Sequence, residues 1–156
     1  PQAIASYKQA IDLYKKYGYT RNISREMLAI ADCYRLECNY DGVVSAAEEA
    51  RSYCVTQADR NNVAIYETYG LFMLGRYAEF ADRCQYLKNN KQSLDNGYNI
   101  INHAFAACSA IYEHRDDDAV KIIDGLADIS PAEHYRLCSA YYKFKGNYAK
   151  SIEYMK

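Results

Sequence analysis

Cysteine and histidine are the residues of this chain whose chemistry is easiest to recognise, because both ligate metals and take part in catalysis. The chain has 6 cysteines and 3 histidines, and no two cysteines show the C-x-x-C spacing of a zinc or redox site. His134 and Cys138 are four residues apart, so a helix would place them on one face. Two ligands without a third and fourth partner do not make a zinc site, whereas free cysteine packs as a small apolar side chain. We therefore expect reduced cysteines that fill helix contacts and bind no metal.

The three consecutive carboxylates Asp116, Asp117 and Asp118 could hold a cation. They fall at a predicted helix start, where acidic side chains interact favourably with the helix dipole, so we interpret them as solvated helix-end charges. The sequence contains no glycine-rich phosphate loop and no nucleophile elbow. We therefore expect a protein that is not an enzyme and that uses no cofactor.

The composition is that of a soluble, helical chain. A formal net charge of -1 provides no electrostatic footprint for nucleic acid or for an anionic membrane surface. No segment approaches the run of about 18 apolar residues that a membrane-spanning helix needs. Only 2 prolines and 7 glycines interrupt the 156 residues, which favours an all-α fold. Together with reduced thiols, these features suggest a cytoplasmic protein.

The segment 130–156 shows how these helices are organised. Ser130 and Glu133 have the spacing of a capping box, with Pro131 in the first turn. Apolar and small residues then recur at helical spacing on both sides of a predicted turn at Lys145–Asn147. The pattern predicts a hairpin of two helices.

The same pattern of stripe, turn and stripe recurs along the chain, after a first helix over 4–17 that Gly18 can end. We expect Ser24 to cap the next helix, and either longer helices or longer connections at 56–62 and 88–92. The predicted hairpins are 24–53 with a turn at Cys38–Asn39, 64–87 with a turn at Gly75–Tyr77, 94–128 with a possible cap at Asp95 and a turn at His114–Asp116, and 130–156.

The spacing Ser139-x-x-Tyr142-x-x-x-Gly146-x-Tyr148-x-x-Ser151-Ile152 resembles the tetratricopeptide repeat family, and Tyr7 and Tyr40 are 33 residues apart, close to the family's period of about 34. The resemblance implies a right-handed superhelical α-solenoid of about nine helices, a single array over 1–156. A compact helical bundle is the alternative, because periodicity does not fix topology. The interrupted pattern at both ends suggests a fragment of a longer protein, in which Ile152 and Met155 would be left uncovered and would promote fraying or self-association.

In that family the first helix of each hairpin lines a concave groove that holds a segment of a partner protein. Matching the turns and stripes, the resemblance implies the following groove residues: Asp32, Arg35, Ile65, Tyr69, Phe72, Cys108, Ile111, Arg136, Ala140 and Lys143. The family's carboxylate clamp looks absent, because one key position holds Asp32, Tyr69, Cys108 and Ala140 in successive units. We expect Tyr69 and Phe72 to face solvent in the groove; the alternative is that both pack between helices.

Two functions fit these expectations. The first is a non-catalytic scaffold that binds a protein or peptide segment in its groove. The second is a ligand- or peptide-sensing module of a larger bacterial signalling protein, such as a sensor kinase or transcription regulator, whose tetratricopeptide arrays this chain resembles. A kinase or DNA-binding segment beyond residue 156 would favour the second function.

Overall fold

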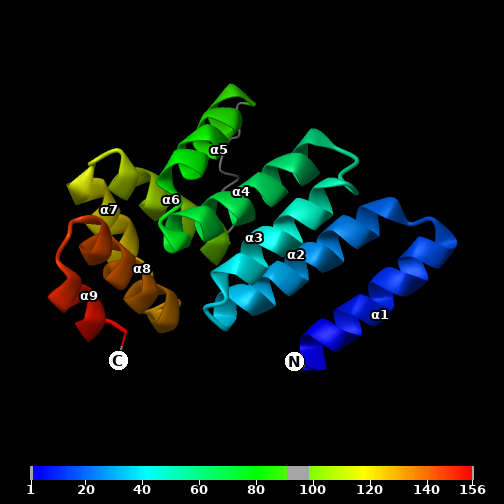
Figure 1. Ribbon diagram of the computed structural model, residues 1–156, viewed down its shortest axis with the longest axis horizontal. Helices are drawn as coiled ribbons and strands as arrows, with labels where there is room; N and C mark the ends of the chain where they lie inside the picture. Colours follow the sequence, from blue (N-terminus) through cyan, green and yellow to red (C-terminus); the bar gives the residue numbers. More distant parts are fainter. Residues whose placement is uncertain (1, 91–98, 156) are drawn as a thin grey trace. The chain divides into compact units, whose positions relative to one another are not determined.

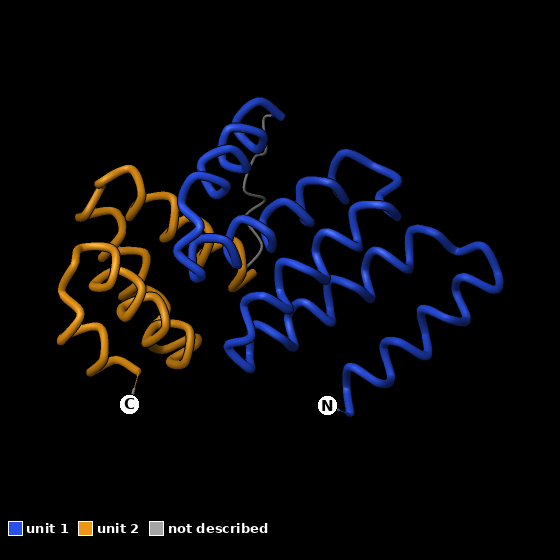
Figure 2. Tube along the Cα trace, viewed as in Figure 1, with its two compact units in different colours: residues 1–93 blue, residues 94–156 orange. Residues whose placement is uncertain are grey.

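The computed structural model describes residues 2–90 and 99–155, and every regular element in that part of the chain is an α-helix. The expected all-α class is therefore confirmed. The helices group into two compact units, residues 1–93 and residues 94–156 (Figure 2), and each unit is described by itself. The helices are α1 (Gln2–Tyr17), α2 (Thr20–Leu36), α3 (Tyr40–Arg51), α4 (Gln57–Leu74), α5 (Tyr77–Asn89), α6 (Ile100–Tyr112), α7 (Asp116–Asp124), α8 (Pro131–Phe144) and α9 (Tyr148–Glu153).

The first unit is a row of helices in which each packs on the next, from α1 to α5 (Figure 1). Helix α2 also contacts α4, so α4 has neighbours on three sides: α2, α3 and α5. Small residues let these helices approach closely, since a Cβ on Gly70 of α4 would come within 2.7 Å of the Val44 side chain on α3. The buried apolar residues of this unit include Ile11, Ile23, Met27, Ile30, Val43, Val44, Val63, Ile65, Tyr69, Leu71, Phe72, Phe80 and Leu87.

The second unit consists of the α6–α7 pair and the α8–α9 pair, with α8 packed on both α6 and α7. Helix α6 is rich in alanine, and small side chains let α7 and α8 lie close to it. The buried apolar residues of this unit include Ile101, Ala104, Ala107, Cys108, Ala110, Ile111, Ala119, Ile123, Leu126 and Leu137. Ile152 in α9 and Met155, which follows that helix, are exposed, as the sequence pattern predicted.

The predicted turns at Gly18, Cys38, Gly75, His114 and Gly146 are all confirmed, and all five residues have left-handed backbone conformations, with φ between 57° and 78°. After α4 the Gly75 amide donates to the Phe72 carbonyl and the Arg76 amide to the Leu71 carbonyl, both at 2.9 Å, which satisfies carbonyls that the helix end would leave unpaired. These hydrogen bonds join residues that are close in sequence, so the turn can be predicted from the sequence without knowing what packs around it.

One of two expected helix boundaries is wrong. Helix α2 begins at Thr20, and Ser24 is buried inside it, with its hydroxyl 3.6 Å from the Cys54 thiol. At 56–62 the longer helix, the first of the two expected alternatives, is confirmed, because α4 begins at Gln57 and Thr56 and Asp59 form a capping box. The Thr56 amide donates to the Asp59 carboxylate at 2.9 Å, and the Asp59 amide donates to the Thr56 hydroxyl at 3.1 Å.

The remaining expected caps have different outcomes. Ser130 directly precedes α8, but its side chain makes no capping hydrogen bond, and Glu133 is buried and pairs with Arg136 instead. The expected cap at Asp95 and part of the connection at 88–92 lie outside the described residues. Helix α6 begins at Ile100, with the Asn99 side chain accepting from the Ile101 amide at 3.2 Å.

The Asp59 cap makes the stability of the first unit depend on pH. Burial disfavours the charged carboxylate, but hydrogen bonds from Thr56 and the nearby Arg21 guanidinium hold the pKa of Asp59 below its usual value. A carboxyl with a lowered pKa in the folded state stabilises the fold fully above its unfolded pKa of about 3.9, and this contribution is lost as the pH falls towards the folded value.

We predict that Asp59→Asn lowers the free energy of unfolding by about 1 kcal/mol at pH 7, as for loss of a helix cap, and that the difference from wild type shrinks below about pH 4. Urea denaturation at several pH values between 7 and 3 measures this. Asp82→Asn, at an exposed carboxylate of α5 with no ion pair in the described chain, is the control. A deficit for Asp59→Asn that stays constant down to pH 3 would contradict the interpretation.

Candidate functional site

The expectation that Tyr69 and Phe72 face solvent is wrong. Both are buried, with Tyr69 0% and Phe72 2% exposed, and Ile65 is buried beside them on the same helix. The Tyr69 ring lies edge-on to Tyr40 at 6.0 Å, and the Phe72 ring lies 5.1 Å from that of Phe80. Packing between helices, the alternative interpretation, therefore describes these side chains. The reason is that α2, α3 and α5 all pack on α4, so more than one face of this helix is buried.

Two of the predicted groove residues, Asp32 and Arg35 on α2, do come together. The Arg35 Nε donates to Asp32 Oδ1 at 2.8 Å, and the hydroxyl of Tyr66 on α4 lies 3.5 Å from the same oxygen. The Arg35 side chain is only 5% exposed, whereas that of Asp32 is 37% exposed. We call these three residues the Asp32 face. It presents a partly exposed carboxylate whose position is set by a buried guanidinium and by the neighbouring helix.

Tyr66 is a residue that the sequence interpretation missed in favour of Tyr69. Burial raises the pKa of Tyr66 above its usual value, and the adjacent Asp32 charge raises it further. The phenol therefore stays protonated and keeps its hydrogen for the carboxylate. The spacing of the turns did not point to Tyr66, because the turns at Cys38 and Gly75 are 37 residues apart and place Tyr69 at the position equivalent to Asp32.

In the second unit most of the predicted groove residues are buried. Cys108 and Ile111 are fully buried on α6, and Ala140 is buried on α8, so none of the three offers a side chain for binding. Arg136 is largely covered and its guanidinium lies 3.1 Å from the buried Glu133 carboxylate. Lys143 is exposed. The three buried residues therefore do not line an accessible groove.

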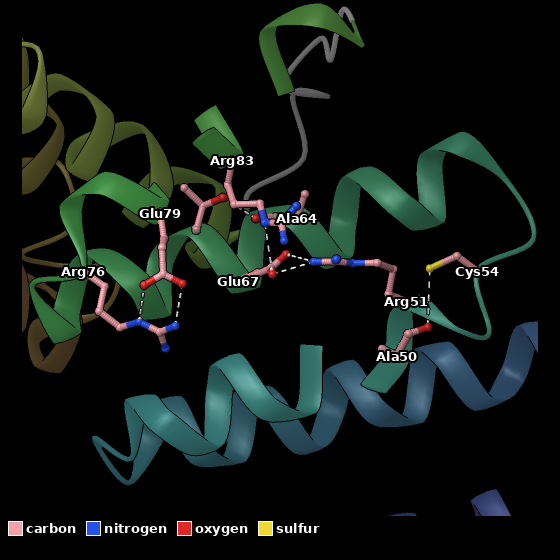
Figure 3. Close-up of polar contacts among 9 residues, drawn as sticks. Ala50, Arg51, Cys54, Ala64, Glu67, Arg76, Glu79 and Arg83 are labelled. Atoms are coloured by element: carbon pink, nitrogen blue, oxygen red, sulfur yellow. Dashed lines mark hydrogen bonds and ion pairs between the residues drawn. The ribbon is translucent and has the colours of Figure 1, made fainter. Parts of the chain in front are cut away.

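A buried carboxylate on α4 was also missed. Glu67 is 2% exposed, and it accepts from Arg51 at the end of α3 at 2.5 Å and from Arg83 on α5 at 3.1 Å (Figure 3). The two arginines are partly exposed, so each guanidinium keeps contact with water while its charge is balanced inside. Because both arginines bind it, Glu67 serves to connect three helices and is not available as a catalytic base. The sequence signal was one acidic residue within the apolar segment 63–72.

His134 and Cys138 are the histidine and cysteine that the sequence places on one helical face. Cys138 Sγ and Asp124 Oδ1 lie 3.6 Å and 3.8 Å from the same nitrogen of His134, Nε2, so the imidazole does not bridge them through its two nitrogens. Burial raises the pKa of the Cys138 thiol, and the Asp124 charge adds to this, which opposes formation of the nucleophilic thiolate. Within residues 2–90 and 99–155, no cluster of three or more His, Cys, Asp or Glu residues could hold a metal ion.

The acidic run at the start of α7 is engaged in ion pairs. Lys145 Nζ lies 2.7 Å from an Asp116 carboxylate oxygen, and Arg115 donates to Asp118 at 2.6 Å. These contacts agree with the interpretation of the run as helix-end charges.

Comparisons of this chain with protein-family models, with curated proteins and with solved structures find no match. The helices of the described segments include none with the length and apolar character needed to cross a membrane.

We predict that Glu67→Gln lowers the free energy of unfolding by about 2–3 kcal/mol, because Arg51 and Arg83 lose their shared counter-charge. Thermal and urea denaturation measure the loss. Glu79→Gln is the matched control. Glu79 pairs with Arg76 at 2.6 Å (Figure 3), and both side chains are exposed, so the loss of this pair should change the free energy of unfolding little. Equal losses in the two variants would show that the buried ion pairs of Glu67 contribute no more to the free energy of unfolding than an exposed ion pair does.

Tyr69→Ala should cost about 3–5 kcal/mol, as for other large buried side chains, and at least as much as Leu71→Ala. Tyr17→Ala is the control, because Tyr17 on α1 is 62% exposed. Urea denaturation of the three variants measures these losses. A Tyr69→Ala protein as stable as the Tyr17→Ala protein would contradict the burial of Tyr69.

Proposed function

We propose that this protein is a non-catalytic scaffold that binds a peptide segment of another protein, and that the Asp32 face is its binding site in the first unit. The observation that carries the proposal is the Asp32 carboxylate, which is accessible to solvent although Arg35 and Tyr66 fix its position. A carboxylate held in place before binding loses little conformational freedom when a partner arrives.

The surroundings of Asp32 support a partner with a basic side chain next to an apolar one. Arg35 donates to Oδ1 of Asp32, which leaves Oδ2 as the natural acceptor for a lysine or arginine of the partner. Leu36 lies one turn further along α2 and is 56% exposed, so an apolar side chain of the partner can pack there. Aliphatic contact beside a charged hydrogen bond is a common way to anchor a peptide.

We further propose that the hairpins belong to a tetratricopeptide-like, right-handed superhelical array. The support is the repeated left-handed turn after α2 and α4, at Cys38 and Gly75, with the same pair of backbone hydrogen bonds at each. The free cysteines, two of them buried, favour a reducing compartment such as the cytoplasm.

The test is a selection of random peptides displayed on phage against the wild-type protein. We predict that selected peptides contain a basic residue and bind Asp32→Asn about ten-fold or more weakly, the loss of one charge-assisted hydrogen bond. Tyr66→Phe should weaken the same peptides less, because Arg35 still orients Asp32.

Asp82→Asn on α5 serves as the matched control, and circular dichroism confirms that each variant is folded. Peptides that bind Asp32→Asn as tightly as wild type would refute the proposed site.

A further inference from the structure

A second surface of the first unit is a groove between α1 and α3, floored by α2, with a volume of about 420 Å³. We call it the α1–α3 groove; it is defined by Lys8, Asp12 and Lys15 on α1, Ile30 on α2, and Ala46 and Glu49 on α3. Ile30 precedes Asp32 by two residues, which is about 200° around a helix, so the groove and the Asp32 face lie on opposite sides of α2. The groove is therefore a separate surface from the proposed peptide site.

The next groove along the unit shows why this one is open. Glu67 lies 37 residues after Ile30, and Arg83 lies 37 residues after Ala46. The turns at Cys38 and Gly75 are separated by the same interval, so these residues occupy equivalent positions. In that later position Arg83 reaches from α5 to Glu67 on α4 and occupies the space between helices. Ala46 has no side chain that could do so. The protein closes one groove with its own ion pair and leaves the equivalent groove open.

The centre of the α1–α3 groove is apolar, with Ile30 of α2 and Ala46 of α3 buried beneath it. Its walls carry opposite net charge, because Lys8 and Lys15 outnumber Asp12 on α1 and Glu49 stands on α3. Lys8 and Lys15 lie two turns apart on the α1 wall, and Glu49 lies on the α3 wall, all three exposed. Lys8, Asp12 and Glu49 make no ion pair in the described chain, while the Lys15 ammonium lies 5.7 Å from the centre of the Tyr53 ring.

From this geometry we propose that the α1–α3 groove binds a segment of a partner protein with one aliphatic side chain at its centre, an acidic residue towards α1 and a basic residue towards α3. The aliphatic side chain lies over Ile30 and Ala46, and the favourable contribution comes mainly from removing its own apolar surface from water. The acidic residue pairs with Lys8 or Lys15, and the basic residue pairs with Glu49. The volume falls within the range of about 300–1,000 Å³ that is usual for ligand sites.

The experiment uses three labelled synthetic peptides with a central leucine, flanked by one acidic and one basic residue, by two acidic residues or by two basic residues. Fluorescence anisotropy measures their binding to the whole chain carrying Asp32→Asn, in which the proposed peptide site at the Asp32 face is weakened and the groove is intact. This protein should bind the mixed peptide about ten-fold more tightly than either of the others, because only that peptide pairs with both walls. Equal binding of all three peptides would overturn the proposal, because the groove would then bind the leucine alone and ignore the charged residues. Failure of all three peptides to bind would also overturn it.

Two kinds of variant make the test specific. Glu49→Lys renders both walls basic, and its preference should move to the peptide with two acidic residues. Ala46→Arg imitates Arg83 and should abolish binding of all three peptides. Both variants are made in the Asp32→Asn protein, so failure at the groove is distinguishable from failure at the Asp32 face. A Glu49→Lys protein that keeps the preference for the mixed peptide would overturn the proposal even if the Ala46→Arg protein does not fold.

Discussion

The burial of the Glu67 carboxylate is the constraint on which the first unit depends. A charge removed from water is costly unless it is paired with good geometry, and the pairs come from two different helices, Arg51 at the end of α3 and Arg83 on α5. The carboxylate is therefore stable only when α3, α4 and α5 have all assembled. Helix α4 becomes the centre of the unit, with its aromatic residues in the core.

This arrangement determines which side chains of the first unit remain accessible for the partner that we propose. A helix that is buried from several sides has few side chains left for recognition, so the accessible features lie on the neighbouring helix α2. One side of α2 carries Asp32, oriented by Arg35 and approached by Tyr66. The other side forms the floor of the α1–α3 groove, which stays open because Ala46 stands where the next repeat has Arg83.

The sequence predicted the turns because their causes are local. Gly75 at a left-handed position ends α4 whatever surrounds it, and Cys38 adopts the same conformation with the same hydrogen bonds although it is not glycine. The exposure of Tyr69 could not be predicted in the same way. It depends on Tyr40 and on how many helices surround α4, and helical periodicity places residues on a face without saying what covers that face. Tyr66 was missed for a related reason, since the 37-residue spacing of the turns places Tyr69 at the position equivalent to Asp32 and says nothing of which side chain reaches the carboxylate.

The central claim is that the Asp32 face binds a peptide. The most direct measurement is nuclear magnetic resonance of the isotope-labelled protein during titration with a selected basic peptide. Our account predicts chemical-shift changes concentrated at Asp32, Leu36 and Tyr66, with the Arg35 side-chain signal also shifted. Changes that leave these residues untouched and appear instead around α8 and α9 would contradict it.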